Sequence, residues 1–83
     1  MKRLDSVRVF TADGCEHSKR LLENFHLRSV RFEEINLSAQ PEMIEELRRL
    51  VWERRLPVVV DHERVSIGFE GGSSTFDELG IED

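Results

Sequence analysis

The stretch VRVFTADGCEHSKRLLENF, residues 7–25, decides the fold of this chain. Its alternating apolar residues predict a strand over residues 6–11, and Asp13-Gly14 predicts the turn that ends this strand. Apolar residues then recur every three or four positions, which predicts a helix from about residue 15 to residue 25. Cys15, the only cysteine of the chain, therefore occupies the junction between the strand and the helix.

The rest of the chain alternates between the same two periodicities, without an internal repeat or a linker. Pro41 suits the first turn of a second helix, and the acidic residues after it favour the positive end of the helix dipole. The uninterrupted apolar run that begins at Pro57 is typical of a strand covered on both faces. The expected strands are residues 6–11, 30–37, 57–60 and 64–67, and the expected helices are residues 15–25, residues 41–54 and a short last helix capped by Ser73 or Ser74. This β-α-β-α-β-β-α order predicts an α/β fold, and we expect residues 1–83 to form one domain.

Composition argues against several classes of function. The chain has 83 residues and a net charge of −5, with its basic residues spread along the sequence, which argues against nucleic-acid binding. No apolar run reaches the roughly 18 residues that span a bilayer, and no apolar segment follows the basic start, so neither a membrane protein nor a secreted one is expected. A single cysteine excludes an internal disulfide and a four-thiolate zinc site within one chain. The expected location is the reducing cytoplasm, where a free thiol persists.

The position of Cys15 suits an anion. A helix N-terminus presents unpaired N–H groups and the positive end of the dipole, and the thiolate is the reactive form of cysteine. Nearby basic residues favour a thiolate at this position, whereas the neighbouring Asp13 and Glu16 oppose it. Lone cysteines are more often small buried hydrophobic residues than nucleophiles. The residues alone leave both interpretations of Cys15 open.

Two segments together indicate a family. Residues 7–25 and the later segment RRLPVVVDHERVSIGF, residues 54–69, resemble the glutaredoxin family, a branch of the thioredoxin-like fold. The resemblance extends from Val7 to Ile81 in the same order of elements, and it implies a four-stranded mixed sheet flanked by three helices. In this family a Cys-x-x-Cys or Cys-x-x-Ser motif opens the first helix, a proline with a cis peptide bond begins the third strand, and a glycine-containing turn follows the fourth strand. The matching residues here are Cys15 and Ser18, Leu56-Pro57, and Ile67-Gly68-Phe69.

The resemblance implies a role for each matched residue. Cys15 is the exposed nucleophile that forms a mixed disulfide with its substrate. The backbone of Leu56 pairs with the cysteinyl part of a bound glutathione or peptide, and Arg54 or Arg55 replaces the lysine with which family members bind the glutathione glycine carboxylate. The expected active-site motif is completed by Glu16, His17 and Ser18, and the expected glutathione-binding or thiol-substrate-binding residues are Arg54, Arg55, Leu56, Pro57, Gly68, Phe69 and Glu70.

The implied function is that of a monothiol thiol–disulfide oxidoreductase that takes part in electron transport. Because Ser18 replaces the second cysteine, Cys15 takes up glutathione, and a second glutathione or a partner thiol removes it. The expected partners are glutathione, as a co-substrate, and glutathionylated or disulfide-bearing proteins, and the expected state is a monomer.

Two other functions stay open. One is a dimeric iron–sulfur carrier, in which two Cys15 thiolates and two glutathiones hold the cluster. This alternative is less favoured, because CEHS replaces the CGFS of such carriers, and no metal site is expected from the sequence. The other is a thioredoxin-fold binding module without catalysis. Among the aromatic residues, we expect a core of Phe10, Phe25, Phe32 and Phe76, and a Trp52 that packs on the core or is half exposed.

Overall fold

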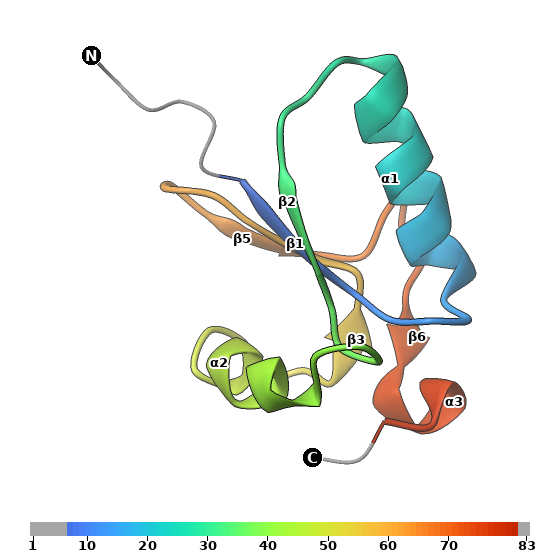
Figure 1. Cartoon of the computed structure of the whole chain (residues 1–83), viewed down its shortest axis with the longest axis vertical. Coiled ribbons are helices and arrows are strands. Elements are labelled where there is room, and N and C mark those ends of the chain that lie inside the picture. The colour runs from blue at the N-terminus through green and yellow to red at the C-terminus, as the bar shows by residue number, and fades with distance from the viewer. Residues whose placement is uncertain (1–6, 82–83) are drawn as a thin grey trace.

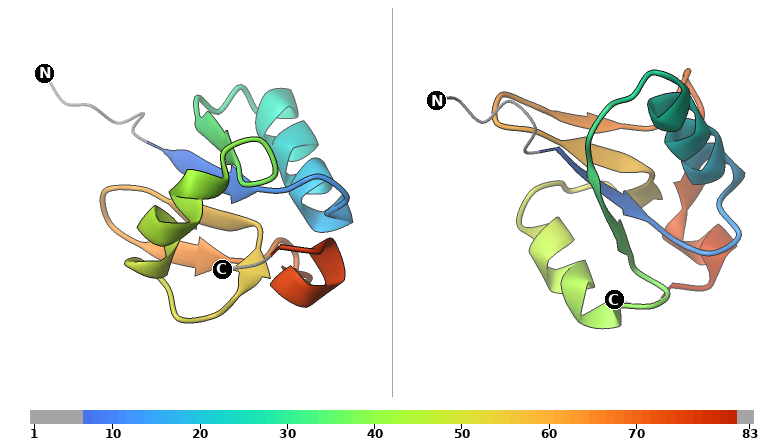
Figure 2. Two further views of the ribbon diagram at one scale, coloured as in Figure 1. Left: turned by 60° about the horizontal axis from the view of Figure 1, so that its bottom comes forward. Right: turned by 45° about the horizontal axis from the view of Figure 1, so that its top comes forward.

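The computed structural model describes residues 7–81, and its centre is a mixed β-sheet. The strands of this sheet are β1 (Arg8–Thr11), β2 (Glu33–Asn36), β4 (Val58–Val60) and β5 (Val65–Ile67). Their order is β2-β1-β4-β5; β1 and β2 are parallel, and the other neighbouring pairs are antiparallel (Figure 1). The helix α1 (Glu16–Leu27) lies on one side of the sheet, and α2 (Ile44–Arg48) lies on the other (Figures 1 and 2). The expected start of the first strand at Ser6 lies outside the described residues.

A second, two-stranded sheet was not predicted from the sequence. It pairs β3 (Arg55–Leu56) with β6 (Ser74–Thr75) in antiparallel register, so that Leu56 lies opposite Ser74. The peptide bond between Leu56 and Pro57 is cis. Pro57 has no N–H to donate, and it separates β3 from β4. This small sheet places Ser74 and Thr75 beside Leu56, the residue that precedes the proline.

The second helix is much shorter than expected. In place of one helix over residues 41–54, the chain forms a 3-10 turn, η1 (Pro41–Met43), and then α2, which ends at Arg48. The predicted end of this helix at residue 54 was wrong. Arg55 is extended because it pairs with Thr75, and residues 49–54 connect α2 to this strand. The expectation for Trp52 was wrong as well, since its side chain is 96% exposed in this connection.

The core lies mainly between the sheet and α2. Phe10 and Phe76 are buried there as expected, with Ile44 and Leu47 of α2 in the same cluster. Phe76 is the first residue of α3 (Phe76–Leu79), so this short helix shares the α2 side of the core.

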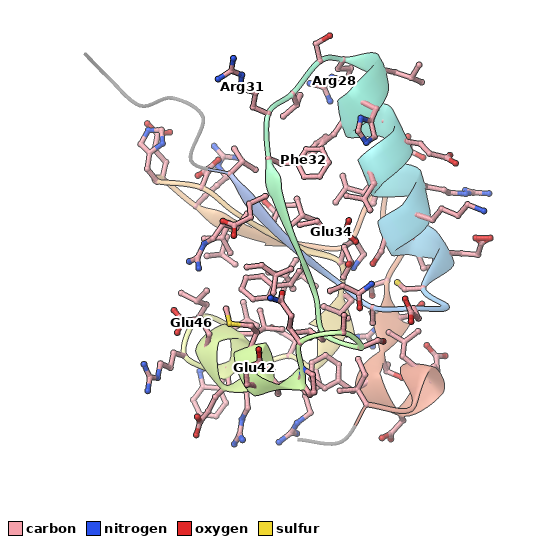
Figure 3. All side chains as sticks on the ribbon, viewed as in Figure 1. Arg28, Arg31, Phe32, Glu34, Glu42 and Glu46 are labelled. Carbon is pink, nitrogen blue, oxygen red and sulfur yellow. The ribbon has the colours of Figure 1, made fainter. Side chains whose placement is uncertain are left out.

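Phe25 and Phe32 are only half-buried, which corrects their assignment to the core. Phe32 lies between β2 and α1 (Figure 3), and its ring centroid is 5.5 Å from that of Phe25. Phe32 precedes β2, which begins at Glu33. The two rings therefore pack on each other beyond the end of this strand.

The last helix is capped by Thr75, and not by Ser73 or Ser74. The Thr75 hydroxyl accepts a hydrogen bond from the Glu78 N–H at 3.2 Å, and the Glu78 carboxylate accepts one from the Thr75 N–H at 2.9 Å. This reciprocal pair is a capping box. Both serines have other partners: Ser73 accepts a hydrogen bond from Arg55, and Ser74 is paired in β6.

Replacing Ser29 with glycine is expected to stabilise the protein by about 0.5–1 kcal/mol, because Ser29 ends α1 in the left-handed region with a φ of 57°. Its N–H donates to the His26 carbonyl, and the next N–H donates to Phe25, so the turn is fixed. Gly80, with a φ of 73°, is the matched control at the end of α3, and Gly80→Ala should destabilise the protein by about 1 kcal/mol. Urea unfolding of the two variants measures both changes. A loss of stability in Ser29→Gly would contradict this explanation of the turn.

Candidate functional site

Cys15 is the N-cap residue of α1, as its position in the sequence indicated. The Ser18 N–H donates a hydrogen bond to Sγ at 3.4 Å, and the thiol donates one to the Leu56 carbonyl at 3.7 Å. The side chain is only 4% exposed, so the expectation of an exposed nucleophile was wrong. The reason is that these two contacts turn Sγ inward, where Cys15 joins the core cluster together with Leu56 and Ala12.

The two contacts of Sγ depend differently on its protonation state. A thiol satisfies both, because it donates to the Leu56 carbonyl and accepts from the Ser18 N–H. A thiolate has no proton to donate, so it keeps the contact with Ser18 and faces the negative end of the Leu56 carbonyl dipole. The contact with the Leu56 carbonyl therefore belongs to the thiol form alone.

An open cavity of about 500 Å³ borders the thiol on the side of α1 and β2. Cys15 and Ser18 line it, together with the charged residues Asp13, Glu16, Lys19 and Glu34. Glu34 extends from β2 toward α1 (Figure 3), and its carboxylate accepts a hydrogen bond from the Thr11 hydroxyl at 2.8 Å. Cys15 thus borders an open space, even though little of its own surface is exposed.

His17 contacts the C-terminal part of the chain. Its imidazole ring lies where a side chain on Gly72 would be, so a Cβ added at Gly72 would overlap the ring. Gly72 belongs to a tight turn in which it exchanges two backbone hydrogen bonds with Phe69, of 2.8 and 2.9 Å. Glu70 and Gly71, between them, both have positive φ, of 52° and 81°. The second residue after Cys15 therefore packs directly on this turn.

Gly68 is required by a close approach of the chain to itself. Its N–H donates to the Pro57 carbonyl at 2.7 Å, and its φ is 92°. A Cβ at this position would lie 2.9 Å from the Gly72 carbonyl oxygen. The glycine turn after β5 thus places Gly68 beside Pro57, and the close approach to Gly72 is what requires a glycine there.

Comparison with known proteins identifies the family. A sequence model of the glutaredoxin family matches residues 7–65. The chain belongs to the glutaredoxin family. A solved structure of a glutaredoxin from Archaeoglobus fulgidus is similar, with a TM-score of 0.69 and 25% sequence identity over 81% of this chain and 78% of that one. No curated protein matches the sequence.

The family and the structural match confirm the expected glutaredoxin-type fold, with a mixed four-stranded sheet and three helices. They support an oxidoreductase-like function in thiol–disulfide chemistry for this glutaredoxin-family chain. The functions assigned to single site residues stay predictions.

Arg54 and Arg55 flank the Cys15 site of this glutaredoxin-family chain in different ways. The Arg55 guanidinium donates a hydrogen bond to the Ser73 hydroxyl at 3.0 Å. The Arg54 carbonyl accepts one from the Phe76 N–H at 2.9 Å, and both arginines line a cavity of about 390 Å³ beside α3. Both arginines therefore lie beside this cavity, directly before Leu56 in the chain.

Sequence analysis missed Gly72 and Ser73 as neighbours of the site. The Gly71-Gly72 pair was the available signal, because paired glycines mark a tight turn. Within residues 7–81, no group of three or more His, Cys, Asp or Glu side chains is arranged to hold a metal ion. No helix in the same range is long and apolar enough to cross a membrane.

Proposed function

We propose that this protein is a monothiol thiol–disulfide oxidoreductase in which Cys15 carries glutathione as a mixed disulfide. The observation that carries the proposal is the position of Cys15 as the N-cap of α1, where the Ser18 N–H donates to Sγ. Sulfur can accept this hydrogen bond with or without its proton, so the contact can persist through the exchange. Ser18 replaces a second cysteine, and the chain has no other thiol, so resolution within the chain is excluded.

The proposed reaction has two exchanges. The Cys15 thiolate attacks the glutathione sulfur of a glutathionylated protein, the old S–S bond breaks, and the protein thiolate leaves and takes up a proton. The thiolate of a second glutathione then attacks the Cys15–glutathione disulfide. Cys15 leaves as a thiolate, and oxidised glutathione is the product. Each cycle releases one protein thiol from its mixed disulfide, and it joins one reduced glutathione to the transferred glutathione as oxidised glutathione.

The Leu56 carbonyl has a different role in each state of Cys15. In the resting thiol it accepts the S–H. Once Cys15 has formed a mixed disulfide there is no S–H, and the Leu56 carbonyl becomes available to an N–H of the bound glutathione or peptide. The thiol contact therefore keeps the acceptor satisfied until a substrate arrives. Arg54 and Arg55 supply the positive charge for a carboxylate of the ligand.

A binding module without catalysis is the second candidate function. The burial of Cys15, at 4% exposure, is the observation that favours it. A cysteine that stayed in the core in the presence of disulfides would serve packing only. Turnover separates the two functions, since a binding module has none.

We expect the wild-type protein to catalyse the reduction of a glutathionylated peptide by reduced glutathione, and Ser18→Ala to retain this activity within about threefold. The contact with Sγ comes from the backbone N–H of residue 18, and the buried Ser18 hydroxyl has no hydrogen-bond partner. Peptide release followed by mass spectrometry measures the rate. Arg20→Gln, an exposed change on α1, is the matched control. Absence of turnover in the wild type would refute the proposed function and leave the binding module.

A further inference from the structure

Trp52 and the arginines around it form a surface of which the proposed chemistry uses only Arg54. The Trp52 side chain is 96% exposed. It borders a cavity of about 510 Å³ together with the apolar residues Leu47 and Val51, and the charged residues that also line this cavity are Arg48, Arg49, Arg54, Glu45 and Glu53. We call Trp52, Arg48, Arg49 and Arg54 the Trp52 surface.

An exposed tryptophan beside arginines is typical of a protein interface. Tryptophan and arginine are the residues most enriched among those that dominate binding energy, because they combine a large contact area with directed polar contacts. On a free surface the indole of Trp52 leaves a large apolar area in water, which a partner would bury.

The charge of this segment points to the chemistry of the partner. Residues 48–55 contain four of the twelve Lys and Arg residues of a chain whose net charge is −5, and only one acidic residue. Arg49 and Glu46 are 4.0 Å apart, with side chains that are 74% and 41% exposed, so this ion pair at the surface is weak. Against Glu45 and Glu53, the three arginines that line the cavity leave an excess of positive charge. An acidic segment is therefore the complementary occupant.

The Trp52 surface is connected to the Cys15 site through the backbone. Two residues after Trp52, the Arg54 carbonyl binds the Phe76 N–H, and two residues later the Leu56 carbonyl contacts Sγ of Cys15. Leu56 and Phe76 are both buried in one cluster with Cys15, so this connection is held by the core. Trp52 is thus only four positions from Leu56, the residue whose carbonyl contacts Sγ.

We propose that the Trp52 surface docks an acidic protein segment that carries an apolar side chain, on the protein whose disulfide Cys15 reduces. The apolar side chain of the partner covers Trp52, and its carboxylates face the arginines. The link to a disulfide substrate rests on the proposed function; the docking itself does not.

Trp52 is the only tryptophan, and the chain has no tyrosine, so intrinsic fluorescence reports on this surface directly. The probe is a short synthetic peptide of glutamates with one Phe and one Leu at its centre, added to the Cys15→Ser protein so that no disulfide chemistry interferes. We expect a blue shift of Trp52 emission that saturates with peptide and is lost when salt rises from about 0.1 M to about 1 M, as the Debye length falls from about 10 Å to about 3 Å. A lysine peptide with the same Phe and Leu should give no shift.

Variants of the Trp52 surface show which side chains contribute to binding. The affinity is measured by the fluorescence anisotropy of the dye-labelled glutamate peptide. We expect Trp52→Ala and the double change Arg48→Gln/Arg49→Gln each to weaken binding by at least about tenfold. Arg20→Gln, on α1, is the control and should bind as the wild type does. In the protein that retains Cys15, the Trp52→Ala variant should react with oxidised glutathione at the wild-type rate. It should react more slowly than the wild type with a mixed disulfide of the glutamate peptide.

The outcomes separate this proposal from the proposed function. Equal binding of the acidic and basic peptides, or unchanged binding by Trp52→Ala, would overturn the docking proposal whatever Cys15 does. If the acidic peptide binds at Trp52 but the protein has no turnover, the docking proposal is supported and the proposed oxidoreductase function is refuted.

Discussion

Cys15→Ser is expected to remove turnover of a glutathionylated peptide, with a loss of at least about a thousandfold in rate. A serine hydroxyl is not ionised near neutral pH and forms no disulfide, so the first exchange cannot occur. No other residue can replace it, because the chain has no second cysteine. The measurement is the rate of peptide release in the presence of reduced glutathione, with the uncatalysed reaction as the baseline.

The control for this variant is its fold. Serine keeps the size of the side chain and can still donate to the Leu56 carbonyl and accept from the Ser18 N–H, so the far-UV circular dichroism should be unchanged. Turnover by folded Cys15→Ser above the uncatalysed rate would show that another group performs the chemistry.

The second large effect concerns stability. Leu47→Ala is expected to lower the free energy of unfolding by about 2–5 kcal/mol, because Leu47 is 1% exposed in the core beneath α2. Leu27→Ala removes the same atoms from a side chain that is 85% exposed at the end of α1, and it should change the free energy by less than about 0.5 kcal/mol.

Urea unfolding of the two leucine variants under identical conditions measures the difference. Domains are usually stable by about 5–15 kcal/mol, so Leu47→Ala should remove a large part of the total. Equal effects of the two changes would contradict the placement of α2 against the sheet.

The first half of the fold was predictable because local patterns and tertiary contacts agree there. In residues 7–25 the alternation of the strand, the Asp13-Gly14 turn and the helical spacing all indicate the elements that the structure contains. The run at Pro57 likewise predicted a buried strand, which the structure contains as β4.

What could not be predicted depends on contacts between distant segments. Strands β3 and β6 have two residues each, too few to show a periodicity, and they exist because Leu56 and Ser74 meet in space. Because of the same pairing, the second helix is shorter than predicted, and Thr75 caps α3 in place of the predicted Ser73 or Ser74. No sequence pattern contained this information, because the two segments are separated by the β4–β5 hairpin.

The site was predictable in its location but not in its exposure. The Cys-x-x-Ser spacing placed Cys15 at the start of α1, and helix geometry brings the Ser18 N–H to Sγ. Whether Sγ points to solvent or inward depends on the Leu56 carbonyl, forty-one positions away in the chain. The exposure of Trp52 was missed for a related reason, since its burial was inferred from a helix that ends at Arg48.

The most direct test is the rate at which Cys15 reacts with oxidised glutathione in the folded chain, compared with the same chain unfolded in urea, followed by intact mass. We predict one glutathione adduct per folded chain, formed at least as fast as in the unfolded chain and fully reversed by reduced glutathione. An adduct that forms only in urea, with the folded protein unreacted, would show that Cys15 is a packing residue and contradict a redox role for this site.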